Sequence, residues 1–260
     1  MERSKRIRNF LAFCLGILLA GGLMQALHAF RGGSAVIPGG DAIVRAFWQL
    51  VQEGAVWRQT AVTLRHLVEA LLLSTVIGVL IGMAEGASDF VRTLFRPIMF
   101  MLRSIPMIVM VVAVMILVPR VRYAWVPRIT ACLLLVPLIS EAACEGWRRM
   151  EPEWIDVYRL NSGFNLQVLL RVYLPLMAGY LQQAYLNAVG MGLRMVVSAE
   201  YLVQVRDSLG KAVFDKNYNT DFDMVYAYAL LMILLALALS VLPLRLRDAV
   251  LWARRRRNAD

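Results

Sequence analysis

Residues Asp156 to Pro175 read DVYRLNSGFNLQVLLRVYLP, and this polar stretch decides how the rest of the chain is interpreted. It lies between two long apolar runs. Its charged and amide side chains are Asp156, Arg159, Asn161, Asn165, Gln167 and Arg171. Because such groups are unfavourable in lipid, we expect the stretch to lie in water or against another protein. Arg148 and Arg149 precede it, and arginine is enriched in cytoplasmic loops of membrane proteins. The stretch is therefore predicted to be a cytoplasmic loop.

The composition predicts an integral membrane protein. The chain has 260 residues, of which 60% are hydrophobic, and its mean hydropathy is +0.61. Globular domains have fewer apolar residues, and these recur periodically rather than in long runs. The net charge of +10 could suggest nucleic acid, but most of the basic residues flank apolar runs, so lipid headgroups and topology explain them better and no nucleic-acid partner is expected. The cysteines and histidines lack metal-ligand spacing, so no metal site is predicted.

The apolar runs predict an all-α fold with about six transmembrane helices. These runs cover residues 10–30, 61–84, 97–118, 129–144, 175–202 and 224–244. Residues 1–30 form a cytoplasmic N-terminus and the first helix. Residues 31–60 form an external loop with an amphipathic helix after Asp41, residues 61–250 form the core domain, and residues 251–260 form a basic cytoplasmic tail. Within the core domain, residues 85–96 are predicted to form a turn, and residues 119–128 and 203–223 to form loops.

Two further features concern helix packing and topology. Gly78 and Gly82 form a small-xxx-small pair, which is typical of closely packed helices. Lys and Arg are more frequent on the side of the membrane that would hold both termini, so both termini are predicted to be cytoplasmic. We therefore expect a multi-pass membrane protein.

The stretch quoted above resembles the "EAA" loop of ABC importer permeases, the segment that docks onto the ATPase. Asp156 stands in the Glu position of that pattern, Val157 and Tyr158 in the two Ala positions, and Ser162, followed by Gly163, in the Gly position. The pattern ends at Leu174-Pro175. Further segments resemble nitrate-, sulfonate- and taurine-type permeases, namely Leu102-Arg103-Ser104-Ile105-Pro106, Ala199-Glu200, Leu209-Gly210 and Asn219-Thr220-Asp221.

This resemblance implies a type I ABC importer permease-like fold with a cytoplasmic coupling helix at about residues 150–175. It also implies a bacterial-type cytoplasmic (inner) membrane as the location. It implies a transport subunit rather than an enzyme, paired with a second permease copy, an ABC ATPase dimer and an extracytoplasmic substrate-binding protein. The chain lacks a Gly-x-x-x-x-Gly-Lys-[Ser/Thr] phosphate loop, so ATP and Mg are expected on the ATPase and no cofactor on this chain. The implied solutes are of the nitrate, sulfonate, taurine, bicarbonate or vitamin-precursor class.

Two sets of site residues follow. The coupling set is Trp154, Asp156, Val157, Tyr158, Arg159, Ser162, Gly163, Leu174 and Pro175. The set expected along the translocation pathway is Arg103, Pro106, Glu141, Arg194 and Glu200. Arg103 is a cation next to a proline in an apolar run, and Glu200 is expected to face the outer mouth or a partner subunit.

Two other classes of protein remain open. An ion-coupled secondary transporter could use the carboxylates Glu69, Glu141 and Glu200 as proton carriers. Against it, the chain has no visible inverted repeat. A membrane-embedded enzyme is disfavoured because no cluster of His, Asp and Glu and no nucleophile–base pair is evident. Transport or catalysis by the chain purified without any ATPase would favour these alternatives.

Overall fold

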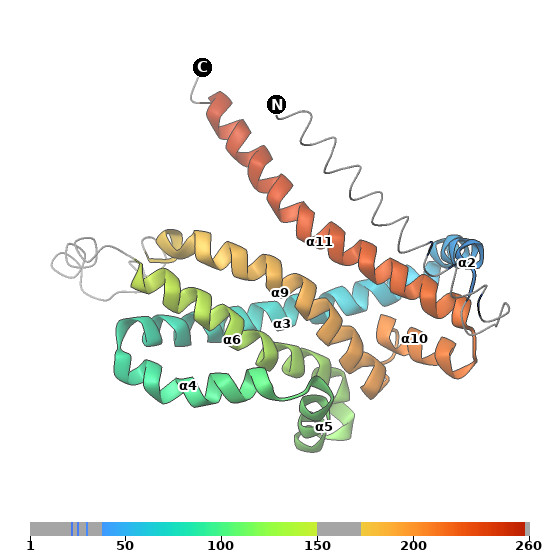
Figure 1. Ribbon diagram of the computed structural model, residues 1–260, viewed down its shortest axis with the longest axis horizontal. Coiled ribbons are helices and arrows are strands. Elements are labelled where there is room, and N and C mark those ends of the chain that lie inside the picture. Colours follow the sequence, from blue (N-terminus) through green and yellow to red (C-terminus); the bar gives the residue numbers. More distant parts are fainter. Residues whose placement is uncertain (1–21, 23–24, 26–29, 31–37, 150–172, 258–260) are drawn as a thin grey trace. The chain divides into compact units, whose positions relative to one another are not determined.

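The computed structural model describes residues 22, 25, 30, 38–149 and 173–257 of the chain. Almost all of the predicted first helix therefore lies outside the described residues, and so does most of the coupling stretch, from residue 150 to residue 172. Every described element is a helix, as the predicted fold class requires (Figure 1).

The described elements are, in chain order, α2 (Gly40–Gln52), α3 (Gly54–Ala87), α4 (Asp89–Ser104), α5 (Met107–Leu117), the 3₁₀ helix η1 (Arg120–Trp125), α6 (Val126–Arg148), α9 (Leu174–Val203), α10 (Leu209–Tyr218) and α11 (Phe222–Arg257). Residues 150–172, between α6 and α9, are outside the described part. The chain divides into two compact units. The first comprises Met1–Trp57 and Ala212–Leu234, and the second comprises Arg58–Lys211 and Leu235–Asp260.

Only part of the predicted set of membrane-crossing helices can be compared with the structure, because the first predicted helix lies almost entirely outside the described residues. Within the described residues, the segments that are long and apolar enough are Gly54–Ala87, Arg122–Arg148 and Phe222–Ser240. The pair α4 and α5 makes a fourth if it counts as one bent span. The predicted fifth span forms α9 but does not reach this apolar level, because α9 carries Gln182, Gln183, Asn187, Arg194 and Glu200.

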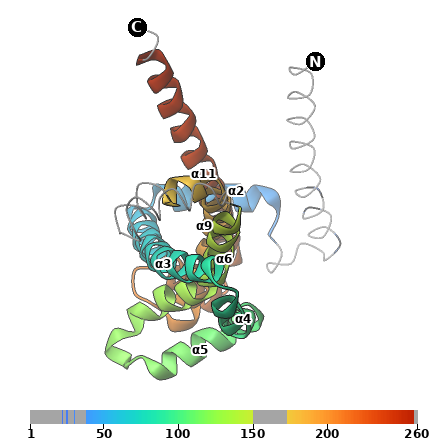
Figure 2. The same ribbon diagram turned by 90° about the vertical axis from the view of Figure 1, so that its left-hand side faces the viewer.

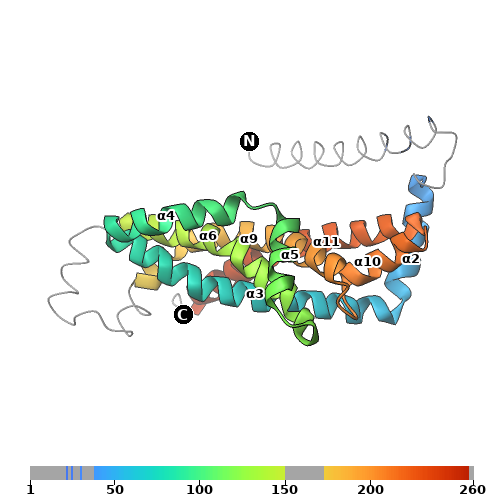
Figure 3. The ribbon, with the colours of Figure 1, turned by 90° about the horizontal axis from the view of Figure 1, so that it is seen from below.

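The predicted span 97–118 is present as two helices with a sharp bend between them. It is divided between α4 and α5, whose axes differ by 106° (Figure 3). The break lies at Ile105 and Pro106, where Ile105 has an extended backbone with φ −68° and ψ 123°. A proline disfavours helical geometry at the residue before it, which explains why α4 ends here.

Two predicted connections are also largely helical. The predicted turn over residues 85–96 is reduced to Ser88, which caps α4 by accepting a hydrogen bond from the Val91 backbone N–H. The predicted loop over residues 203–223 contains α10. The amphipathic helix predicted after Asp41 is present as α2, which buries Ala46 and Leu50.

The core of the second unit is formed by α3, α6 and α9 (Figure 2). Buried apolar side chains from all three helices meet there, namely Val79, Met83, Ile139, Ala143, Trp147, Met177 and Leu181. The Trp147 ring at the end of α6 stacks on the Tyr173 ring immediately before α9, with centroids 4.8 Å apart. The two helix ends that flank residues 150–172 are therefore held together by packing.

Close approach of α3 to α6 depends on three glycines spaced one turn apart. A Cβ atom added at Gly78 would lie 2.9 Å from the Ile139 Cβ, and one at Gly86 would lie 2.6 Å from the Trp147 Cβ. At Gly82 an added Cβ would lie 2.7 Å from the Ala143 Cβ and still closer to a backbone oxygen of α6. The predicted packing role of Gly78 and Gly82 is confirmed, and it extends by one turn to Gly86.

Replacing Gly82 by alanine is expected to destabilise the folded chain by about 1–3 kcal/mol, the usual cost of overpacking a filled interface. Gly190→Ala in α9 is the matched control, because a Cβ there meets no atom within 4 Å. Thermal unfolding of both purified variants in the same detergent measures the difference. A melting temperature for Gly82→Ala equal to that of Gly190→Ala would contradict the tight contact between α3 and α6.

Candidate functional site

A charged groove lies between α4 and α6, next to the end of α3. Its volume is about 690 Å³. Arg92, Arg96 and Arg103 lie along one side of α4, because their spacing of four and seven residues repeats close to the helical period. Glu141 and Glu145 of α6 lie on the opposite wall. The groove therefore presents guanidinium groups on one wall and carboxylates on the other.

One ion pair joins the two walls of this groove. Arg103 Nη2 lies 2.8 Å from Glu141 Oε2 and also donates a hydrogen bond of 3.0 Å to the Pro137 carbonyl oxygen. The two side chains remain 46% and 64% exposed. Pro106 is exposed at the break that follows α4. Two residues of the predicted pathway set, Arg103 and Glu141, therefore meet in the groove, whereas Pro106 is not part of its lining.

A second groove lies on the other side of the α6 carboxylates, between α6 and α9. Its volume is about 440 Å³, and it shares Glu141 and Glu145 with the first groove. From α9 it is lined by Tyr180, Gln183 and Asn187. Sequence reasoning did not predict Gln183 or Asn187 as site residues. Their spacing of four residues within an apolar run is the signal that could have identified them.

The two grooves together form what we call the polar face, which consists of Arg92, Arg96, Arg103, Glu141, Glu145, Gln183 and Asn187. Charged and amide groups that remain exposed on such helices are unfavourable against lipid. The polar face must therefore contact water or another protein. By contrast, α3 exposes the apolar side chains Leu72, Val76 and Leu80, which suit lipid.

Arg194 was also expected on the pathway. It is exposed on α9, two turns beyond Asn187.

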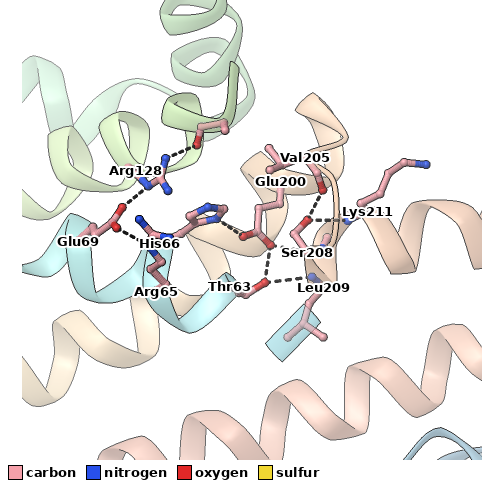
Figure 4. A network of polar contacts seen from close by, with 12 residues as sticks. Thr63, Arg65, His66, Glu69, Arg128, Glu200, Val205, Ser208, Leu209 and Lys211 are labelled. Atoms are coloured by element: carbon pink, nitrogen blue, oxygen red, sulfur yellow. Dashed lines mark hydrogen bonds and ion pairs between the residues drawn. The ribbon is translucent and has the colours of Figure 1, made fainter. Parts of the chain in front are cut away.

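Glu200, at the end of α9, lies in a separate and fully buried network (Figure 4). Its Oε2 atom accepts hydrogen bonds from Thr63 Oγ1 at 2.8 Å and from the Gly210 backbone N–H at 3.3 Å. Its Oε1 atom lies 2.7 Å from Nδ1 of His66, which is only 3% exposed. The Leu209 backbone N–H donates to Thr63 Oγ1 at 3.0 Å. The network thus links α3, the end of α9 and the start of α10.

The position of Glu200 corrects the expectation that it faces an outer mouth or a partner subunit. Its side chain has no exposed surface, and Gly210 in the first turn of α10 packs directly against it. A Cβ atom at Gly210 would lie 2.5 Å from the Glu200 Cβ, so only glycine allows this approach. His66 and Thr63 were missed as partners, although their spacing of three residues places them on the same face of α3.

Glu69 lies in a second cluster close to the first (Figure 4). It pairs with Arg65 at 2.8 Å and with the buried Arg128 of α6. The Arg128 guanidinium also lies 4.8 Å from the centroid of the Trp125 ring. Arg128 was expected in an external loop, but it belongs to the first turn of α6. With Glu69 placed between two arginines and Glu200 enclosed, the structure does not favour either carboxylate as a mobile proton carrier.

The coupling set lies mostly outside the described residues. This applies to Trp154, Asp156, Val157, Tyr158, Arg159, Ser162 and Gly163. The two described members are at the start of α9, where Pro175 occupies the first turn and Leu174 packs against the α3–α6–α9 core. A proline is well tolerated at this position, since its missing N–H has no helical partner there.

Glu200→Ala is expected to destabilise the protein by at least ~2 kcal/mol, because buried donors on Thr63, His66 and Gly210 lose their acceptor. Glu145→Ala is the control, since its pair with Arg149 is half exposed and such pairs contribute little. Thermal unfolding in detergent measures both variants.

A double-mutant cycle with Glu200→Gln and Thr63→Val should give a coupling free energy of about 0.5–3 kcal/mol. Additive effects of the two changes would contradict the hydrogen bond between these side chains.

The comparisons with known proteins agree with the helical architecture. The model of a family described as "Binding-protein-dependent transport system inner membrane component" matches residues 74–255. A solved structure of the MetNI methionine ABC transporter in inward-facing conformations contains a chain with the same fold, at a TM-score of 0.60 and 20% identity. The match covers 78% of this chain and 96% of that chain. The comparison with curated proteins finds no match. Because the family model spans more than half of its residues, this chain belongs to the family of binding-protein-dependent transport system inner membrane components.

Proposed function

We propose that the chain is the permease subunit of an ATP-driven ABC importer, and that solute crosses the membrane along the polar face. The observation that carries this proposal is the exposure of charged and amide side chains on α4, α6 and α9. Glu141 lies about 10 Å before the end of α6, counted as seven residues of helix, yet its side chain is 64% exposed. Such a group is stable in a membrane if it borders water or a partner.

A second permease copy would complete the pathway. One chain leaves the polar face open, and lipid is a poor neighbour for the Arg103–Glu141 pair. A second copy that covers this face would enclose a polar route between two identical surfaces, which is the arrangement of a two-fold homodimer.

The coupling stretch would transmit movement from the ATPase to this face. We infer that the coupling stretch, at about residues 150–175, docks as an amphipathic helix in a groove of a separate ABC ATPase dimer. Supporting this, Trp147 and Tyr173 stack at the base of the stretch, and Met177 packs beneath them. A force applied to the stretch would therefore act on α6 and α9 together. These two helices form both walls of the second groove, so their movement would open or close it.

The remaining assignments follow from this role. ATP and Mg would bind the ATPase, so this subunit is not itself an enzyme. An extracytoplasmic binding protein would deliver a small solute of the nitrate, sulfonate, taurine or vitamin-precursor class. The chain would be a multi-pass protein of the bacterial-type cytoplasmic membrane with both termini in the cytoplasm.

Tyr158→Asp tests the coupling role. The change would bury an unpaired carboxylate in the ATPase groove, at a cost of about 3–5 kcal/mol. Co-purification with the ATPase and ATP-driven uptake into proteoliposomes should both fall, while membrane insertion stays normal. Tyr218→Asp is the matched control, because Tyr218 of α10 is 79% exposed. Normal ATPase binding and uptake in Tyr158→Asp, and again in Val157→Asp, would rule out this stretch as the coupling element. Uptake by the chain without an ATPase would instead favour a secondary transporter.

Arg103→Leu tests the polar face. It leaves Glu141 without its cation, so uptake should fall while association with the ATPase is kept. The exchange variant R103E/E141R restores opposite charges at these positions and should recover part of the uptake. Uptake by Arg103→Leu equal to that of the wild type would remove Arg103 from the pathway.

A further inference from the structure

The charges in the groove between α4 and α6 do not all neutralise one another. Each carboxylate on its walls has a partner. Asp89 pairs with Arg148, Glu141 pairs with Arg103 at 2.8 Å, and Glu145 pairs with Arg149 at 2.6 Å. The fourth carboxylate, Glu85, is 7% exposed and accepts a hydrogen bond of 2.9 Å from the Ser140 hydroxyl.

Two cations in the same groove lack such partners. Arg92 and Arg96 line the groove and are exposed, and neither forms a side-chain hydrogen bond or ion pair with another described residue. They lie one helical turn apart on α4, which places their Cβ atoms roughly 6 Å from each other. Guanidinium groups at this separation can converge on one oxygen-rich anion, because each offers a planar fork of N–H donors.

The surroundings of Arg92 and Arg96 would strengthen such an interaction. Met99 and Phe100 of α4 and Pro137 of α6 contribute apolar surface to the groove, and the Pro137 carbonyl oxygen accepts a hydrogen bond from Arg103. Charge–charge attraction increases where apolar walls displace water. Arg103 is already neutralised, so the cations available to a ligand are those nearer the start of α4.

We propose that Arg92 and Arg96 bind an anionic oxygen-acid group, such as a carboxylate, sulfonate or phosphate, and select for solutes that carry one. This inference rests on the proposed transport function, since it names the chemistry of the solute that uses the groove. The same chemistry is present in the headgroup of an anionic lipid, so the test must separate these two sources.

Equilibrium dialysis with radiolabelled sulfate, at constant ionic strength in sodium chloride, tests the site. The sample is the full chain with its ATPase in nanodiscs of phosphatidylcholine. We expect saturable sulfate binding to the wild type and at least ~10-fold weaker binding to R92Q/R96Q, because two charge-assisted contacts are lost. R120Q/R122Q is the matched control, since Arg120 and Arg122 are exposed on η1 and lie outside the groove. This control should bind sulfate like the wild type.

A second arm identifies a lipid source. The wild type and R92Q/R96Q are reconstituted in phosphatidylcholine mixed with phosphatidylglycerol, and bound lipid is measured by native mass spectrometry. The site would be assigned to lipid if two results occurred together. The variant would carry less bound phosphatidylglycerol than the wild type, and the wild type would not bind sulfate. This combination would overturn solute selection. Equal sulfate binding by the wild type and R92Q/R96Q would overturn the site altogether. Association of the wild type with its ATPase is measured in parallel. Absence of this association would contradict the importer assignment, independently of the result for sulfate.

Discussion

The close approach of α3 to α6 is the constraint on which the rest of the second unit depends. Gly78, Gly82 and Gly86 leave no room for a Cβ atom at the contact. This allows α6 to pack against α3 on one side and α9 on another, and it brings Glu85 of α3 within hydrogen-bonding distance of Ser140 on α6. In a membrane the contact must be sustained mainly by van der Waals packing, because lipid is as apolar as the helices themselves.

Polar side chains are accommodated in two different ways in this structure. Glu200 and His66 are enclosed and are satisfied by neighbouring groups, so they contribute to the join between α3, α9 and α10. The polar face carries charged and amide groups that remain exposed, and these are available to water, a solute or a second subunit. Burial with complete hydrogen bonding favours a structural role, whereas exposure on otherwise apolar helices favours a role in transport.

Much of the fold could be predicted from the sequence because hydropathy is a local property. The helical class, the boundaries of α6 and α9 to within a few residues, and the packing role of Gly78 and Gly82 all follow from runs and spacings. The direction of the chain at a break and the contacts between distant residues were not predicted. The span 97–118 is bent by 106°, and the loop after α9 is largely helical.

The sequence by itself determined that this is a helical membrane protein, because long apolar runs with few charges are stable as helices in a lipid bilayer. It also identified Arg103 and Glu141 as candidate pathway residues, because charged groups within apolar runs are rare. Only the tertiary structure decided which of these charges meet. Arg103 and Glu141 are 38 positions apart and pair at 2.8 Å, whereas Glu200 is enclosed by Thr63 and His66. Exposure and ion pairing depend on which helices pack against each other, and the spacing of residues within a single run does not specify the partner helix.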